Sequence, residues 1–75
     1  MYTKEEFRKF ASFVKNSATD KKAAIAAIVF VVKNEDRFNQ MYEFMKDNPQ
    51  ATFNEINYKE SEIVLEECIK AQRLD

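Results

Sequence analysis

The sequence predicts a small all-helical domain, and three observations favour this class over a fold that contains a sheet. The 75 residues include no glycine and one proline, whereas tight hairpins and phosphate-binding turns need glycine for positive φ angles or close backbone approach. Apolar side chains recur at helical spacing in three segments. A favourable N-cap residue or a capping-box pair precedes each helical segment. We therefore expect residues 1–75 to form a single helical domain, a compact bundle of four helices with a short extra helical turn before the last helix.

The first helix is expected over about residues 4–16. Thr3 and Glu6 have the capping-box spacing, in which each side chain accepts a hydrogen bond from the other residue's backbone N–H. The apolar residues that follow lie on one helical face, which we expect to enter the core: Phe7, Phe10, Ala11, Phe13 and Val14.

The second helix is expected to begin after Thr19 or Asp20 and to contain the uninterrupted apolar run 23–32. This run is too short to span a membrane, which needs about 20 residues. Its β-branched residues would also suit a buried strand, but no second strand exists to pair with it, so a helix is favoured. The bulky residues Ile25, Ile28, Val29 and Val32 share a face that we assign to the core. The opposite face carries Ala23, Ala26 and Ala27, and would allow a neighbouring helix to approach closely.

The third helix is expected to begin after Asn34, with Glu35 and Asp36 near its positive N-terminus, and to end before Pro49. Its apolar face is expected to pack inward: Phe38, Met41, Tyr42, Phe44 and Met45.

Two capping-box spacings then follow one another. Thr52 and Glu55 are expected to open the short extra turn, and Asn57 and Glu60 to start a last helix over about residues 58–73. The inner face expected for that helix consists of Tyr58, Ser61, Val64, Leu65, Cys68, Ile69 and Gln72. Ile63 lies off this face and is expected to be exposed. We expect the second helix to sit centrally among the other three.

The composition argues against an enzyme and against a bound metal or cofactor. Histidine is absent and Cys68 is the single cysteine, so no zinc site built on imidazole and no nucleophile with a histidine base can form. The carboxylates clustered between Glu60 and Glu67 point to different sides of a helix and are expected to be solvated. Cys68 is expected to pack as a small apolar residue. The lone thiol and the lack of a signal peptide favour a cytoplasmic protein.

Surface recognition is the function class that these observations leave. Residues 1–34 carry seven basic and three acidic side chains, a net charge of +4, whereas residues 35–75 carry five basic and ten acidic ones, a net charge of −5. Such asymmetry can steer association, and ten aromatic residues are more than a domain of this size is expected to enclose. We therefore expect a protein partner or self-association. Phe13 and Phe30 are the expected apolar anchors, and Glu62 and Glu66 the expected orienting charges.

A nucleic-acid-binding regulator of helix-turn-helix type is the alternative. The acidic last helix would be an unfavourable recognition helix among phosphates, so this alternative relies on the basic N-terminal half. Its candidate residues are Lys4, Arg8, Lys15, Lys21 and Lys22.

Overall fold

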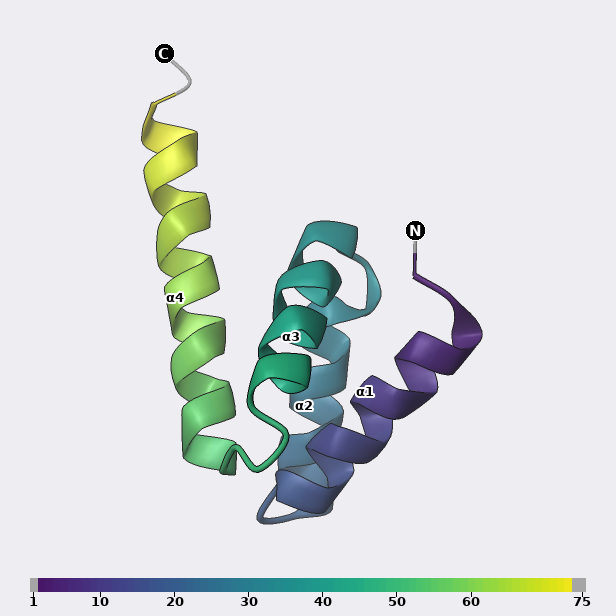
Figure 1. Cartoon of the computed structure of the whole chain (residues 1–75). Helices are drawn as coiled ribbons and strands as arrows, with labels where there is room; N and C mark the ends of the chain where they lie inside the picture. Colours follow the sequence, from purple (N-terminus) through teal and green to yellow (C-terminus); the bar gives the residue numbers. More distant parts are fainter. Residues whose placement is uncertain (1, 74–75) are drawn as a thin grey trace.

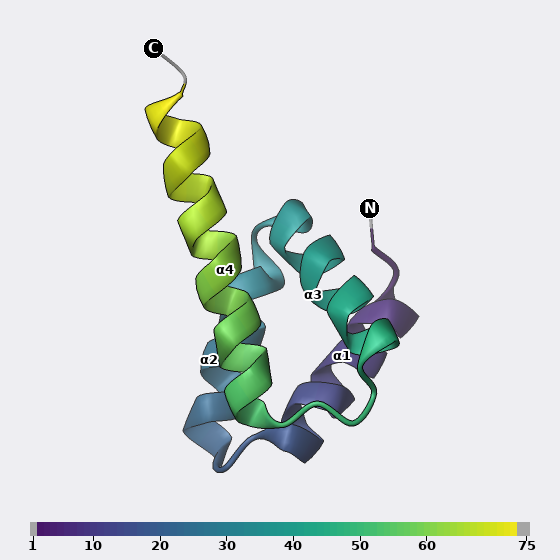
Figure 2. The same ribbon diagram turned by 60° about the vertical axis from the view of Figure 1, so that its left-hand side comes forward.

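Four helices joined by short connections account for most of residues 2–73, the part of the chain that the computed structural model describes. They are α1 (Lys4–Ser17), α2 (Lys21–Val32), α3 (Glu35–Asp47) and α4 (Phe53–Gln72). No strand occurs within residues 2–73, so the all-helical class is confirmed and the apolar run 23–32 lies in a helix. Figure 1 shows α4 beside the other three helices, and in Figures 1 and 2 its C-terminal end extends beyond them.

The first three helices begin at the polar residues that the sequence predicts, and the fourth begins at Thr52, where only a short turn was expected. Thr3 and Thr52 form complete capping boxes with Glu6 and Glu55. The Asp20 carboxylate accepts a hydrogen bond from the Ala23 N–H at 2.7 Å. Asn34 caps α3 in the same way, through the N–H of Arg37 at 3.1 Å. These caps satisfy N–H groups that have no partner inside a helix, and they fix where the helices start.

The core is apolar and is built around the Phe38 ring. Phe10 meets this ring edge-on with the centroids 5.5 Å apart, while Tyr2 and Tyr42 stack on it at 4.0 and 5.5 Å. The Tyr2 hydroxyl also donates a hydrogen bond to the carbonyl oxygen of Val32, which ties the N-terminal segment to the end of α2. The buried cluster consists of Phe10, Val14, Ala24, Ala27, Val31, Phe38, Met41, Ile56 and Ile63.

The connection from α3 to α4 is anchored on the end of α1. Pro49 follows the last turn of α3, as expected, and the backbone N–H of Ala51 bonds to the carbonyl of Asn48. Ala51 is buried, and the Ser17 hydroxyl lies 3.3 Å from its carbonyl oxygen. This contact between distant parts of the chain helps to set the point from which α4 departs.

The expected core face of α2 is wrong. Ile25, Val29 and Val32 are exposed and Ile28 is only half-buried, whereas Ala24, Ala27 and Val31 enter the core. A continuous apolar run carries almost no periodic signal, so the expected core face rested only on the size of the side chains. Of the expected small face only Ala27 is buried, since Ala26 is exposed and Ala23 half-buried. The small side chains of Ala24 and Ala27 let α1 and α3 lie close to α2. As a result α3, rather than α2, is the helix that packs well against all three others.

The prediction for the last helix was wrong in its start and in its inner face. The turn opened by Thr52 continues without interruption, so α4 begins at Phe53. The face that enters the core contains Ile56 and Ile63, both almost fully buried. Ile63 was expected to be exposed, and Cys68, expected in the core, is exposed. The whole apolar row predicted to face inward, from Tyr58 to Gln72, instead lies on the exposed surface.

Candidate protein-interaction surface

The outward sides of α2 and α4 carry a set of exposed large apolar side chains, which we call the open face. Leu65 is 62% exposed and Val29 61%, values that are typical of polar surface residues. Within residues 2–73 every large apolar side chain of high exposure belongs to these two helices. The members of the open face are Ile25, Val29 and Val32 of α2 and Tyr58, Val64, Leu65 and Ile69 of α4.

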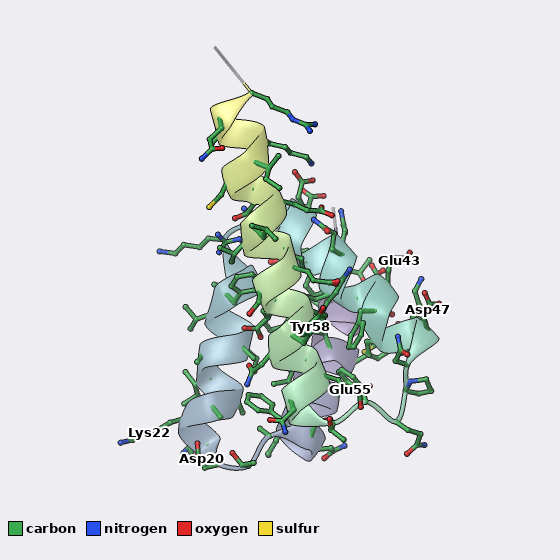
Figure 3. The ribbon with its side chains drawn as sticks, turned by 90° about the vertical axis from the view of Figure 1, so that its left-hand side faces the viewer. Asp20, Lys22, Glu43, Asp47, Glu55 and Tyr58 are labelled. Atoms are coloured by element: carbon green, nitrogen blue, oxygen red, sulfur yellow. The ribbon has the colours of Figure 1, made fainter. Side chains whose placement is uncertain are left out.

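A concavity lies between α2 and α4, beside the α4 part of the open face. Phe30 lines it from α2, and Val64, Leu65 and Cys68 line it from α4. Figure 3 looks onto α4 with α2 beside it. Of the open face only Val64 and Leu65 line this hollow, whereas Ile25 and Val32 line separate concavities together with residues of α1. Exposed apolar side chains gathered beside a hollow, as Val64 and Leu65 are, often mark an interaction site.

Arg37 holds the wall of this concavity in place. Its guanidinium donates two hydrogen bonds to the Glu67 carboxylate, both 2.8 Å long, and a third to the carbonyl oxygen of Phe30. The same group lies over the Phe30 ring, 4.3 Å from its centroid. Bidentate pairing of this kind is more specific than an ordinary surface ion pair. One residue of α3 therefore fixes both the Phe30 ring and the middle of α4.

Pairing and burial move the pKa values of two neighbouring carboxyls in opposite directions. The hydrogen bonds from Arg37 lower the pKa of Glu67. Burial raises the pKa of Glu60, which lines the α2–α4 concavity. One carboxyl oxygen of Glu60 is buried without a hydrogen-bond partner, an arrangement that costs free energy while the group is charged.

The four predicted partner-binding residues are not gathered in one place. Phe30 lies in the α2–α4 concavity, where it is half-buried. Phe13 is also half-buried but lines a separate concavity between α1 and α3, with Met45 and Pro49. Glu62 and Glu66 are exposed on α4. Phe30 and the two glutamates thus adjoin the open face, and Phe13 belongs to a different surface.

The five basic residues of the alternative prediction are all exposed, and four of them lie along the seam between α1 and α2. Lys15 and Lys21 line one concavity with Ile25. Lys4 and Arg8 line another with Val32. The open face therefore has a basic border on the side where α2 meets α1.

Glutamates occupy the other border of the open face. Residues three or four apart are neighbours on a helix surface, which places Glu62 beside Tyr58 and Leu65, and Glu66 beside Ile69. Val64 and Cys68 lie on the opposite side of Leu65, toward α2. The acidic border thus runs along the side of α4 that is remote from α2. Figure 3 shows Lys22 at the α2 edge, and Glu43 and Asp47 beyond α4 at the opposite edge.

The described residues contain no group of three or more Cys, Asp or Glu side chains placed to hold a metal ion. None of the helices within residues 2–73 is long and apolar enough to cross a membrane. Comparison with known proteins finds no matching family model, no matching curated protein and no matching solved structure.

The open face was missed from the sequence although its residues were all noted there. Each stripe has the spacing of a buried helical face, and a single helix offers no sign of whether a neighbour covers that face. The hydrogen bonds of Arg37 to Glu67 and Phe30, and the half-buried Glu60, were not predicted either, because they depend on contacts between separate helices.

Proposed function

We propose that this chain is a small non-enzymatic interaction module that binds protein through its open face. The observation that carries the proposal is the exposure of seven large apolar side chains on α2 and α4, two of which, Val64 and Leu65, line a concavity together with Phe30. Covering such side chains removes apolar surface from water, at about 25 cal/mol per Å². Phe30 would meet the partner at the base of the concavity, and Glu62 and Glu66 would orient it from the border.

Substitutions on the open face test this proposal. Leu65→Asp places a charge at an exposed position, so the fold should be retained while a protein partner is lost. Affinity capture with the full chain from cells that produce it should recover proteins that Leu65→Asp fails to recover. Glu5→Asp, an exposed change on α1, serves as the control and should recover the same set as wild type. Identical recovery by wild type and Leu65→Asp, with helical circular dichroism intact, would contradict the proposal.

Nucleic-acid binding is a second candidate because Lys15 and Lys21, from different helices, share one concavity. Binding of this kind depends on neutralising phosphates and weakens steeply with salt. Double-stranded DNA should then bind at low salt, and replacement of Arg8 and Lys15 by glutamine should reduce both the affinity and the salt dependence. No binding at low salt would exclude this candidate.

A further inference from the structure

The outward side of α2 combines exposed aliphatic side chains with basic ones. Ile25 is 51% exposed, Val29 61% and Val32 40%, and because they stand four and three residues apart they form one stripe along the helix. The sequence from residue 21 to residue 34 contains no Asp or Glu. This side of the molecule therefore exposes apolar surface and attracts anions at the same time.

Basic side chains lie at both ends of the aliphatic stripe and along its α1 side. Two of them line a concavity with Ile25 near the start of α2, and two others line one with Val32 near its end. Lys33 directly follows Val32, and Figure 3 shows the Lys22 side chain extending from the first turn of α2 away from α4. The six exposed cations are Lys4, Arg8, Lys15, Lys21, Lys22 and Lys33.

The charge of these six cations is not neutralised within the described part of the chain. The ion pairs that form there use Lys9, Arg37 and Lys46. Asp20, which precedes α2, is engaged as its N-cap. The next acidic residues along the chain, Glu35 and Asp36, lie in the first turn of α3, where the positive end of the helix dipole offsets their charge.

An anionic lipid surface is complementary to both properties of this side of α2. Its headgroups attract Lys and Arg within a Debye length, and the boundary with the acyl chains accepts an aliphatic stripe. Lysine stems can lie along apolar surface while their ammonium groups reach the headgroups. A nucleic acid would meet the cations equally well, but it would leave three exposed aliphatic side chains facing phosphates.

The length and the packing of α2 suit a helix that lies along a membrane. Its 12 residues are too few to cross a bilayer, which needs about 20. Contacts with α1 and α3 already hold it as a helix, so docking does not have to order the segment. We propose that the outward side of α2 docks this chain on an anionic lipid bilayer, with the aliphatic stripe at the acyl boundary and the six cations among the headgroups.

The inference goes beyond the proposed function and concerns a different part of the surface. Val64 and Leu65 line the α2–α4 concavity from α4, whereas Ile25 and Val32 adjoin α1. A chain docked through α2 therefore keeps the α4 part of the open face for a protein partner.

Pelleting of the full chain with lipid vesicles tests the inference. Wild type should bind vesicles of phosphatidylcholine and phosphatidylglycerol in equal parts, bind phosphatidylcholine alone far more weakly, and lose affinity as salt rises. Val29→Asp should weaken binding to the anionic vesicles by at least about tenfold, because it places a charge at the acyl boundary. Lys21→Gln and Lys22→Gln should each weaken it by about fivefold.

The matched control removes the same positive charge elsewhere on the molecule. Lys9→Gln with Lys46→Gln loses only two exposed ion pairs and should bind the anionic vesicles about as well as wild type. The α2 variants should keep their helical circular dichroism, since Val29 is exposed and cations in a first helical turn are disfavoured by the helix dipole.

A polarity-sensitive dye tests which side of the molecule meets the lipid. Attached to Val29→Cys in a Cys68→Ser background, it should shift its emission to the blue with anionic vesicles. Figure 3 shows Glu43 at the edge opposite Lys22, so the same dye on Glu43→Cys should not shift. An unchanged dye at position 29, or equal shifts at both positions, would contradict docking through α2.

The remaining outcomes separate this inference from the proposed function. No pelleting with anionic vesicles at low salt, or pelleting that withstands both Val29→Asp and the lysine substitutions, would overturn the inference. So would a chain that ignores vesicles and binds double-stranded DNA equally well with and without Val29→Asp. Leu65→Asp should still bind vesicles. If vesicles are ignored while Leu65→Asp loses a captured protein, only the inference fails; if vesicles bind while protein recovery is unchanged, only the proposed function fails.

Discussion

At the scale of single residues, Glu60 and Glu67 are both half-buried on α4 but have opposite surroundings. Glu67 accepts two hydrogen bonds from Arg37, and its pKa is lowered by them. Glu60 has a buried oxygen without a partner, and its pKa is raised by burial. Folding therefore favours the charged form of Glu67 and the neutral form of Glu60.

Glu60→Gln should stabilise the protein at pH 7. A carboxyl whose pKa is raised in the folded state contributes stability that is complete below its unfolded pKa and is lost as pH rises through the folded pKa. Wild type loses this contribution as pH rises through the folded pKa of Glu60, whereas the neutral glutamine has no charge to bury. Urea denaturation followed by circular dichroism should show a higher midpoint for Glu60→Gln at pH 7 and a smaller difference near pH 3.

The matched control is Glu62→Gln, which removes the same charge from an exposed position of the same helix. It should change the midpoint little at either pH. Equal midpoints for wild type and Glu60→Gln at pH 7 would show that the Glu60 carboxylate is well solvated in the folded protein.

Tyr2 illustrates a residue whose role the sequence does not reveal. It precedes the first capping box and belongs to no helical stripe, so periodicity assigns it nothing. Its ring nevertheless stacks on Phe38 with the centroids 4.0 Å apart. Only the meeting of α1, α2 and α3 creates the place that this ring occupies.

At the scale of elements, α1 and α3 could be predicted almost completely. Both have a polar cap, a single apolar stripe and a charged opposite side, and Phe10 and Phe38 are fully buried as expected. The boundaries agree to within a residue, because caps and Pro49 act locally on the backbone. Caps, Pro49 and the spacing of apolar residues are therefore enough to predict a helix that has a single apolar face.

The inner faces of α2 and α4 could not be predicted because each helix carries apolar residues on more than one of its sides. In α4 the buried pair Ile56 and Ile63 and the exposed row through Leu65 are both apolar. The sequence pattern identifies such rows but not which one α3 covers. That choice is made by contacts between helices, and the spacing of residues along one helix does not contain it.

Two neighbouring alanines of α2 offer a direct test of its orientation. Ala27 is 2% exposed, and Ala26 is exposed to solvent. Ala27→Leu should destabilise the fold by about 1–3 kcal/mol, since a close-packed core has no room for added methylenes. Ala26→Leu should change stability by less than about 0.5 kcal/mol. Thermal denaturation of both variants at a low protein concentration is the measurement, and the reverse order of stabilities would mean that α2 is rotated about its axis.

At the scale of the whole molecule, the apolar residues of this short chain are divided between the buried core and the exposed open face. The sequence suggested a surplus of apolar side chains and a charge difference between the halves of the chain, and the structure does expose large apolar side chains. It placed the surplus on Phe13 and Phe30, both of which are half-buried. The exposed members lie instead on the outer sides of α2 and α4, which become visible only after the helices are assembled.

Cys68 reports directly on whether this surface is covered. Its thiol is exposed and borders the α2–α4 concavity, so a thiol reagent should modify it in the folded monomer at a rate close to that of the chain in urea. If a protein partner covers the open face, the rate should fall when that partner is bound. Slow labelling of the chain alone would instead mean that Cys68 is buried within it.

The ring contacts of Tyr2 also have an optical consequence. The chain has three tyrosines and no tryptophan, and Tyr2 and Tyr42 are stacked on Phe38 while Tyr58 is 70% exposed. Near-ultraviolet circular dichroism disappears when fixed tertiary packing is lost, so its tyrosine band would follow the packed rings around Phe38 almost alone. Quenching of tyrosine emission by a dissolved ion would sample Tyr58 first. Two ordinary spectra could thus follow the interior and the exposed side of α4 separately, without any added label.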